Sequence, residues 1–273
     1  MSDKYRGAVF FDLDGTLLDN RTDEIPKSAQ DALGKLKANR YIVCLATGRD
    51  MEAVYSRRYL SVVSPDAVIH MNGTRITAGE TVILQHYMDR DLLRRLIGFS
   101  KKNGFSVGTS IGPYAYYTDP EMKARNDRKW NRYVRRNFRP ADELLERNIP
   151  VMAVDFAADD ILAVKRSVEE VFPEIELFPF NSNTGADAVE KGFSKAKGIE
   201  TVCSYFGIDL KNTWAFGDSM NDIPMLRKAS VGVAMGNADP EVRKAADMET
   251  DTVAEHGIRN ALVRLGLICA GNG

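Results

Sequence analysis

Residues 10–19 read FFDLDGTLLD, and this stretch contributes most to predicting the fold. Ala8–Phe11 is a short apolar run that stops at Asp12, as is typical of a strand buried on both faces of a parallel sheet. Asp12 and Asp14 therefore stand where such a strand ends. Because open α/β sheets bind ligands at the carboxyl ends of their strands, we expect the chemistry to begin here.

Strands and helices alternate from this point along the chain. A helix is predicted over Pro26–Asn39, where apolar residues share one face, and a second strand over Tyr41–Ala46. A third apolar run, Ala67–Met71, ends in the turn signal Asn72-Gly73. This β-α-β-α-β order predicts an α/β fold with a doubly wound, Rossmann-like parallel sheet.

The pattern changes from about residue 83 and returns near residue 187. Between these positions we expect an inserted α+β domain, so that residues 1–82 and 187–273 form the core and residues 83–186 the insert. A long helix inside the insert is predicted over Pro120–Phe138. The other elements expected in the insert are Asp89–Asn103, Phe105–Thr109, Tyr114–Thr118, Val151–Phe156, Ile161–Phe172 and Ile175–Phe178.

Composition narrows the function classes. The 273 residues carry 37 basic and 38 acidic side chains, for a formal net charge of −1. Such a balance provides no field for binding nucleic acid or an anionic membrane, so any phosphate recognition must be local. The expected partner is a small-molecule phosphate ester, and the protein is expected to be a monomer or a small homo-oligomer.

The cysteines and the lengths of the apolar runs bear on where in the cell the protein is expected. Cys44, Cys203 and Cys269 are widely spaced, which argues against a disulfide framework and a zinc site. No stretch approaches the roughly 18 apolar residues that a membrane span needs, and the first residues lack a signal-peptide pattern. We therefore expect a cytoplasmic protein.

Two acidic clusters point to a metal ion. Asp12 and Asp14 would repel one another unless a cation or a catalytic task keeps them together, and carboxylate oxygens suit Mg²⁺. A turn that merely ends a strand is the alternative. The stretch WAFGDSMND repeats the arrangement with Asp218 and Asp222, four residues apart. An EF-hand is excluded, because the glycine its loop requires would fall at Leu17.

Two further motifs suit a phosphate group. Thr47 and Gly48 lie between a strand and a helix, where a hydroxyl and free backbone N–H groups can bind phosphate, although they could also be plain caps. Lys195 follows the expected N-cap Ser194 and could hold a phosphoryl oxygen; the alternative is an ordinary surface lysine. A serine-hydrolase elbow at GDSMN is disfavoured because Asn221 replaces the last glycine.

The motifs and their order along the chain resemble those of the haloacid dehalogenase superfamily of phosphatases. They are D-x-D-G-T, then Thr-Gly-Arg, then Ser-Lys, then G-D-x-x-N-D. The large insert and the MNG sequence at residues 71–73 resemble the Cof-type branch, whose α/β cap covers the active site. One departure is Ala196, where the family often has glycine.

The resemblance implies roles for individual residues. Asp12 would be the nucleophile and Asp14 the general acid and base, with Lys195 as the third catalytic residue. The implied Mg²⁺ ligands are Asp12, Asp218 and the Asp14 carbonyl, supported by Asp222. The expected phosphate- or substrate-binding residues are Thr47, Gly48, Arg49, Asn72, Gly73, Lys195 and Asn221.

The predicted function is hydrolysis of small phosphorylated metabolites, sugar phosphates above all, through an aspartyl-phosphate intermediate. Two alternatives stay open at this point. A phosphosugar mutase could use the same core, and a catalytically silent binding protein could retain the fold.

Overall fold

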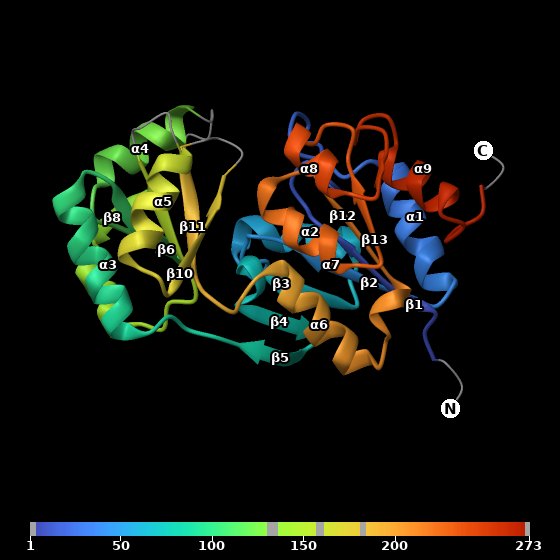
Figure 1. The fold of residues 1–273 in the computed structure, drawn as a ribbon, viewed down its shortest axis with the longest axis horizontal. Coiled ribbons are helices and arrows are strands. Elements are labelled where there is room, and N and C mark those ends of the chain that lie inside the picture. The colour runs from blue at the N-terminus through green and yellow to red at the C-terminus, as the bar shows by residue number, and fades with distance from the viewer. Residues whose placement is uncertain (1–3, 130–135, 157–160, 181–183, 271–273) are drawn as a thin grey trace. The chain divides into compact units, whose positions relative to one another are not determined.

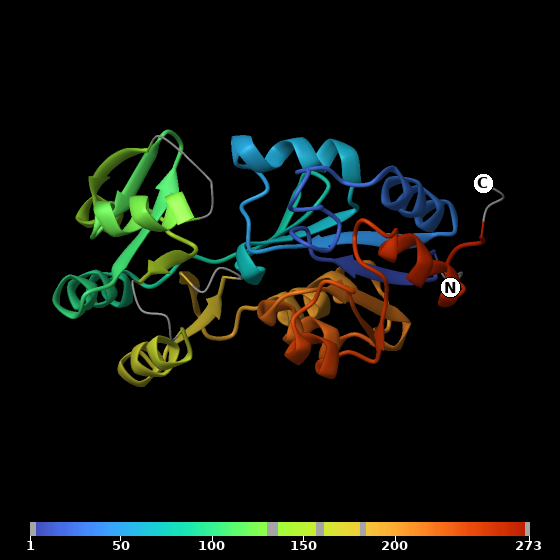
Figure 2. The same cartoon turned by 90° about the horizontal axis from the view of Figure 1, so that it is seen from above.

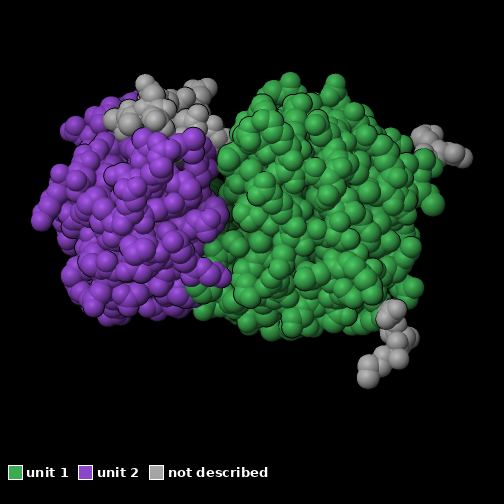
Figure 3. All heavy atoms as spheres, in the orientation of Figure 1, with its two compact units in different colours: residues 1–85, 193–273 green, residues 86–192 purple. Residues whose placement is uncertain are grey.

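The computed structural model describes residues 4–129, 136–156, 161–180 and 184–270. It divides into two compact units, coloured separately in Figure 3. We call residues 1–85 with 193–273 the core unit and residues 86–192 the inserted unit. The predicted boundaries fall inside strands β5 (Thr81–Gln85) and β11 (Gly185–Glu190), whereas the division in the structure leaves both strands whole.

The core unit is built on one eight-stranded sheet with the order β14-β13-β12-β1-β2-β3-β4-β5, and Figure 1 labels all of these strands except β14. The strands from β14 to β3 are parallel, and β4 and β5 add an antiparallel hairpin at one edge. The remaining strands are β1 Gly7–Phe11, β2 Tyr41–Ala46, β3 Ala67–His70, β4 Arg75–Ala78, β12 Thr213–Gly217, β13 Val231–Ala234 and β14 Met248–Glu249.

Helices cover both faces of this sheet, which explains why every residue of β1 and β2 is buried. Figure 2 shows α1 and α2 in blue on one side and α6 and α7 in orange on the other. One apolar core joins the sheet to α1, α2 and α9, and a second joins it to α6, α7 and α8. The bounds are α1 Lys27–Ala38, α2 Val54–Val63, α6 Lys195–Phe206, α7 Ile223–Lys228, α8 Pro240–Ala245 and α9 Gly257–Arg264.

The predicted fold class is confirmed by this sheet. The expected strand over 41–46 has the predicted bounds, and the first helix differs from its prediction by one residue at each end. The hairpin of β4 and β5 was missed, because these strands are short and follow a turn without a clear alternating pattern.

The inserted unit has a six-stranded sheet in the order β10-β11-β9-β6-β7-β8. Its strands are antiparallel except for the pair β7 and β8. Helices α3 and α5 contribute to the apolar core on one face. The bounds are α3 Arg90–Asn103, β6 Ser106–Ile111, β7 Tyr114–Tyr117, α4 Pro120–Lys129, β8 Asn137–Pro140, β9 Met152–Asp155, α5 Ile161–Val171 and β10 Ile175–Pro179.

The predicted helix over 120–138 is wrong at its end. Helix α4 is described as far as Lys129, residues 130–135 lie outside the described part of the chain, and Phe138 belongs to β8. There Phe138 pairs with Ala115 of β7. Basic and apolar residues at helical spacing favoured a continuous helix, but strand pairing overrides that local pattern.

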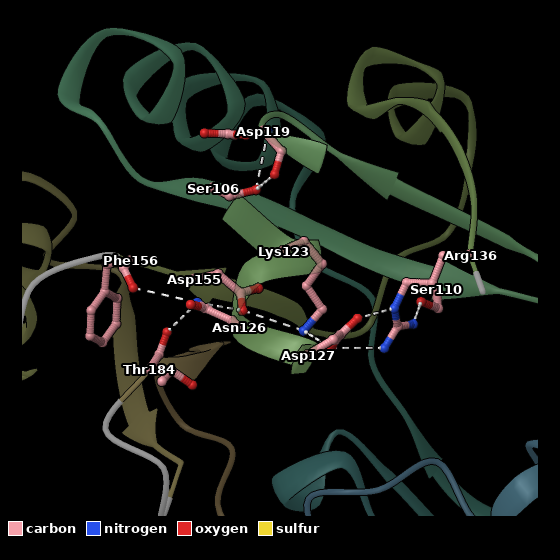
Figure 4. A network of polar contacts seen from close by, with 10 residues as sticks. All are labelled: Ser106, Ser110, Asp119, Lys123, Asn126, Asp127, Arg136, Asp155, Phe156 and Thr184. Carbon is pink, nitrogen blue, oxygen red and sulfur yellow. Dashed lines mark hydrogen bonds and ion pairs between the residues drawn. The ribbon is translucent and has the colours of Figure 1, made fainter. Parts of the chain in front are cut away.

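A polar network ties α4 to the sheet (Figure 4). Lys123 lies 3.3 Å from both Asp127 and Asp155, and Asn126 donates to Asp155 at 3.2 Å. Arg136 contacts Asp127 at 2.6 Å. Because Val154 packs into the apolar core and side chains alternate along a strand, Asp155 points to the opposite face, where α4 lies.

None of the described helices is both long and apolar enough to cross a lipid bilayer.

Candidate active site

Three neighbouring strands of the core unit bring polar side chains to one edge of the sheet. Asp12 follows β1, Thr47 follows β2 and Asp218 follows β12. These strands are adjacent and parallel, so their carboxyl ends meet at the same edge. All three side chains are buried, which is unusual for aspartate and requires partners inside the protein.

Lys195 is the buried cation at this edge. It begins α6, directly after the N-cap Ser194, and is only 1% exposed. Its Nζ lies 2.6 Å from Asp12 Oδ1 and 2.6 Å from Asp222 Oδ1. Burial alone would lower the pKa of Lys195, but the two carboxylates outweigh it and raise that pKa. The alternative considered from the sequence, that Lys195 is an ordinary surface lysine, is therefore wrong.

Asp12, Asp218 and Asp222 form a buried acidic cluster, with one ligand atom from each lying within 4.8 Å of the others. Burial raises the pKa of Asp12 to about 7, although Lys195 opposes the shift. Burial also raises the pKa of Asp218 well above its usual range, and the charges of Asp12 and Asp222 add to it. Three carboxylates share one ammonium group here. This all-oxygen donor set fits a hard divalent cation, which would offset the excess negative charge.

The loop after β1 is shaped around Asp218. Thr16 Oγ1 donates to Asp218 Oδ1 at 3.0 Å. Gly15 has a φ of +81°, and a Cβ there would lie 2.3 Å from Asp218 Oδ2. A side chain at Gly15 would therefore clash with the carboxylate and strain the backbone, which explains why glycine follows Asp14.

Asp222 holds the loop that carries Asp218. Its Oδ2 accepts from the backbone N–H groups of Asp218 at 3.0 Å and Ser219 at 2.9 Å, while its Oδ1 accepts from Lys195. The Ser219 and Asp222 side chains together form a capping box at the short helix Met220–Asp222. Asp222 thus combines a capping contact with a place in the acidic cluster.

Asp14 lies outside that three-residue cluster and makes a different contact. Arg49 Nε donates to Asp14 Oδ2 at 2.7 Å, and Arg49 Nη2 donates to Asp14 Oδ1 at 2.5 Å. The pair is a two-pronged fork between a guanidinium and a carboxylate, a geometry that fixes both groups. The side chains of Asp14 and Arg49 are 31% and 18% exposed.

A strained turn connects the Thr47 loop with the start of α6. Met71, Asn72 and Gly73 have positive φ values of 48°, 54° and 95°. The Asn72 N–H donates to the Thr47 carbonyl at 3.1 Å. A Cβ at Gly73 would lie 2.3 Å from the Ser194 carbonyl oxygen, so only glycine allows this close approach.

Asn221 completes this side of the site, because its Nδ2 donates to Asn72 Oδ1 at 3.3 Å. The structure therefore brings Asn72, Gly73 and Asn221 beside Thr47 and Lys195, although they come from distant parts of the chain. Positive φ values at non-glycine residues cost energy and persist where the surrounding structure enforces them, commonly at functional sites.

Sequence reasoning missed several supporting residues. Asn237 Nδ2 donates to the Gly15 carbonyl at 2.7 Å, and Tyr59 lies against Arg49 with 5.5 Å between the guanidinium carbon and the ring centroid. An isolated asparagine and a helical tyrosine carry no local signal of these long-range contacts. Thr16 is the exception, because its place directly after Asp14-Gly15 in the motif indicates that it lies near the site.

Comparisons with known proteins agree with this geometry. The family model of the haloacid dehalogenase-like hydrolases matches residues 9–262. The solved structure of BT4131, described as a sugar phosphatase of subclass IIB in that superfamily, is 30% identical with a TM-score of 0.84, and the match covers 96% of this chain and 100% of BT4131.

Two relatives from Bacillus subtilis match over most of their length. YkrA, which carries a phosphatase name, is 28% identical across 95% of this chain and 98% of its own. YitU, named 5-amino-6-(5-phospho-D-ribitylamino)uracil phosphatase, is 25% identical across 93% of this chain and 95% of its own. With the family model matching nearly the whole chain, the protein belongs to the haloacid dehalogenase-like hydrolases and is a phosphatase.

Proposed function

We propose that this phosphatase uses Mg²⁺ to hydrolyse small phosphorylated metabolites, chiefly sugar and polyol phosphates, through an aspartyl-phosphate on Asp12. The observation that carries the proposal is the buried cluster of Asp12, Asp218 and Asp222, held by Lys195 at 2.6 Å from two of its carboxylates. Such a cluster costs free energy to bury, and a catalytic task explains why it is retained.

The acidic cluster is the proposed metal site. Asp12 and Asp218 would hold the ion with the Asp14 carbonyl, and Asp222 would support them. When bound, Mg²⁺ would neutralise charge that builds up on the phosphoryl oxygens. Thr47, Lys195, Asn72 and Asn221, with backbone N–H groups at Gly48 and Gly73, are the proposed contacts for the phosphate.

The reaction then has two steps. A carboxylate oxygen of Asp12 attacks phosphorus, the bond from phosphorus to the leaving-group oxygen breaks, and Asp14 gives that oxygen its proton. In the second step Asp14 takes a proton from water, the water oxygen bonds to phosphorus, and the bond to Asp12 breaks. Lys195, already beside Asp12, offsets negative charge in both steps.

The substrate class is supported by the relatives. BT4131 is described as a sugar phosphatase, and YitU is named for a phosphoribityl compound. Both compound types present a phosphate monoester on a carbon chain bearing hydroxyl groups. We extend that class, and neither individual substrate, to this protein.

The inserted unit is proposed to act as the cap that selects among these substrates. Each side chain assigned above to catalysis, metal or phosphate belongs to the core unit, and the insert joins it through two connections. The three cysteines are free thiols, as in a reducing compartment, so the proposal includes a cytoplasmic location.

Phosphate release from a metabolite panel tests the proposal. The metal-stripped protein should be inactive, and added Mg²⁺ should restore phosphate release from sugar and polyol phosphates. The panel includes the phosphoribityl compound that appears in the name of YitU. Phosphorus NMR of the products separates hydrolysis from a mutase, because a mutase would return an isomeric sugar phosphate in place of inorganic phosphate. Full activity in the presence of EDTA would contradict the magnesium assignment.

A further inference from the structure

The fork between Arg49 and Asp14 bears on how the general acid is aimed. Both carboxylate oxygens of Asp14 accept from Arg49, at 2.7 Å and 2.5 Å. Asp14 is the most exposed of the site aspartates, at 31% for its side chain against 7% for Asp12. A carboxylate at such a position has room to change rotamer, and the described contacts of its oxygens all come from Arg49.

Arg49 is itself held by Tyr59. The Arg49 guanidinium carbon lies 5.5 Å from the centroid of the Tyr59 ring, and Tyr59 is only 4% exposed. A guanidinium on an aromatic face gains a cation–π attraction and loses freedom to move. Tyr59 belongs to α2, so the ring supplies a rigid backing from a packed helix.

Tyr59 is fixed in turn at its hydroxyl. Tyr59 Oη donates to Asp23 Oδ1 at 2.6 Å and accepts from Arg58 Nη2 at 2.7 Å. Asp23 lies in the segment between β1 and α1, where its N–H donates to the Asp19 carbonyl at 2.8 Å. The chain of contacts therefore runs from the loop through Tyr59 and Arg49 to Asp14.

We infer that Arg49 is a positioning residue for Asp14: one prong of the fork keeps the carboxyl group in place, while the other oxygen leaves Arg49, carries the proton and faces the leaving-group oxygen. Tyr59 holds Arg49 in place for this task. Proton transfer requires the two oxygens to come within hydrogen-bond distance, and small misplacements of a catalytic group are costly. The inference rests on the proposed function, since it takes Asp14 as the general acid and base.

This role differs from the phosphate contact expected for Arg49 from the sequence. A phosphate ligand contributes to binding whatever the leaving group. A residue that aims the general acid matters most when the leaving group needs a proton. Phenyl phosphate and p-nitrophenyl phosphate separate the two cases, because nitrophenolate departs readily without protonation and phenolate does not.

The test measures kcat/KM for both esters, which reports formation of the aspartyl-phosphate, together with the inhibition constant of inorganic phosphate. For Arg49→Met we expect a loss of about 100-fold with phenyl phosphate but about tenfold or less with p-nitrophenyl phosphate. Inhibition by phosphate should change by less than about threefold, since binding is kept. Arg49→Lys should recover only part of the loss, because an ammonium cannot form the fork.

Tyr59 and Arg57 supply the matched variants. Like Arg49→Met, Tyr59→Leu should lose more activity with phenyl phosphate than with p-nitrophenyl phosphate, but by a smaller factor. For Tyr59→Phe the ratio of the two losses should lie between that of Tyr59→Leu and that of the wild type. Arg57→Met is the control, because Arg57 is an exposed arginine of the same helix and has no described side-chain contact with Asp14, Arg49 or Tyr59; it should keep wild-type ratios.

Melting temperatures confirm that each variant is folded. An equal loss for both esters in Arg49→Met and Arg49→Lys, with or without weaker inhibition by phosphate, would overturn the inference and leave the proposed function standing. A wild-type protein with no activity on either ester would instead count against the proposed function.

Discussion

Each unit of the molecule places a lysine among aspartates, and the two networks differ in charge balance. In the core unit, Lys195 faces Asp12 and Asp222, and Asp218 completes a cluster of three carboxylates around one ammonium group. In the inserted unit, Lys123 and Arg136 face Asp127 and Asp155, so cations and anions are equal in number.

The two lysines also differ in exposure and in the distance to their partners. Lys195 is 1% exposed and lies 2.6 Å from both partners, whereas Lys123 is 12% exposed and lies 3.3 Å from both of its own. The charges of the second network balance one another, and this network fastens α4 to the sheet. A network with an excess of carboxylates favours the binding of a cation and, with it, of a substrate. The comparison teaches that surplus buried charge, more than burial itself, marks a site for chemistry.

The largest expected contrast comes from replacing one aspartate in each network. Asp12→Asn should lower phosphatase activity by about 1,000-fold or more, because an amide cannot form the acyl phosphate. Asp155→Asn should keep turnover of p-nitrophenyl phosphate within about threefold, since Asp155 takes no part in the proposed chemistry. Steady-state kinetics on folded variants would measure both. Comparable losses would erase the distinction between the networks.

Replacing the lysines sharpens the comparison through stability. In metal-free protein, Lys195→Met leaves the buried carboxylates without their cation and should reduce the free energy of unfolding by about 3–5 kcal/mol. Lys123→Met should cost less, because Arg136 still contacts Asp127 at 2.6 Å and the pair distances of Lys123 are longer. Urea unfolding of the two variants provides the measurement. A larger loss for Lys123→Met would show that the core network is the less stabilising one.

A smaller effect concerns pH. Because the pKa of Asp12 is raised from its ordinary value near 3.8 to about 7, the folded state keeps a proton that the unfolded state has lost. This contribution to stability is complete below about pH 4 and is lost as pH rises through 7, by at most about 4 kcal/mol. Urea unfolding of metal-free wild type and Asp12→Asn between these pH values should show the fall as a difference between the two proteins, because buried His70, whose pKa is lowered to about 4, acts in the opposite direction in both.

The control for the pH effect is Asp12→Asn, which should lose part of the pH dependence, while Asp218 and Asp155, whose pKa values burial also raises, keep the remainder. Added Mg²⁺ should reduce the fall in the wild type, since a cation favours the ionised carboxylates. Identical pH dependence in wild type and Asp12→Asn would contradict the assignment of the shift to Asp12.

Much of the core unit could be predicted because its signals are local. Fully apolar strands that stop at Asp12, Thr47 or Asp218 imply a parallel sheet, and parallel strands bring those residues to one edge. The end of the helix begun at Pro120 could not be predicted, because strand pairing of Phe138 decides it.

The same limit applies within the site. The family resemblance implied that Lys195 serves the same site as Asp12, but nothing in the sequence indicated the fork between Arg49 and Asp14. It depends on the side-chain directions of two loops and on the Tyr59 ring behind Arg49. Spacing along a sequence carries no information on such contacts between loops.

The central claim is that Asp12 carries the phosphoryl group during turnover. Wild-type protein mixed with Mg²⁺ and substrate, quenched in acid and reduced with borohydride, should yield a peptide in which residue 12 has become homoserine, because reduction converts an acyl phosphate to an alcohol. The peptide should be unmodified when substrate is omitted. Reduction at another aspartate, or an unmodified residue 12 under conditions in which the phosphoenzyme accumulates, would contradict the account.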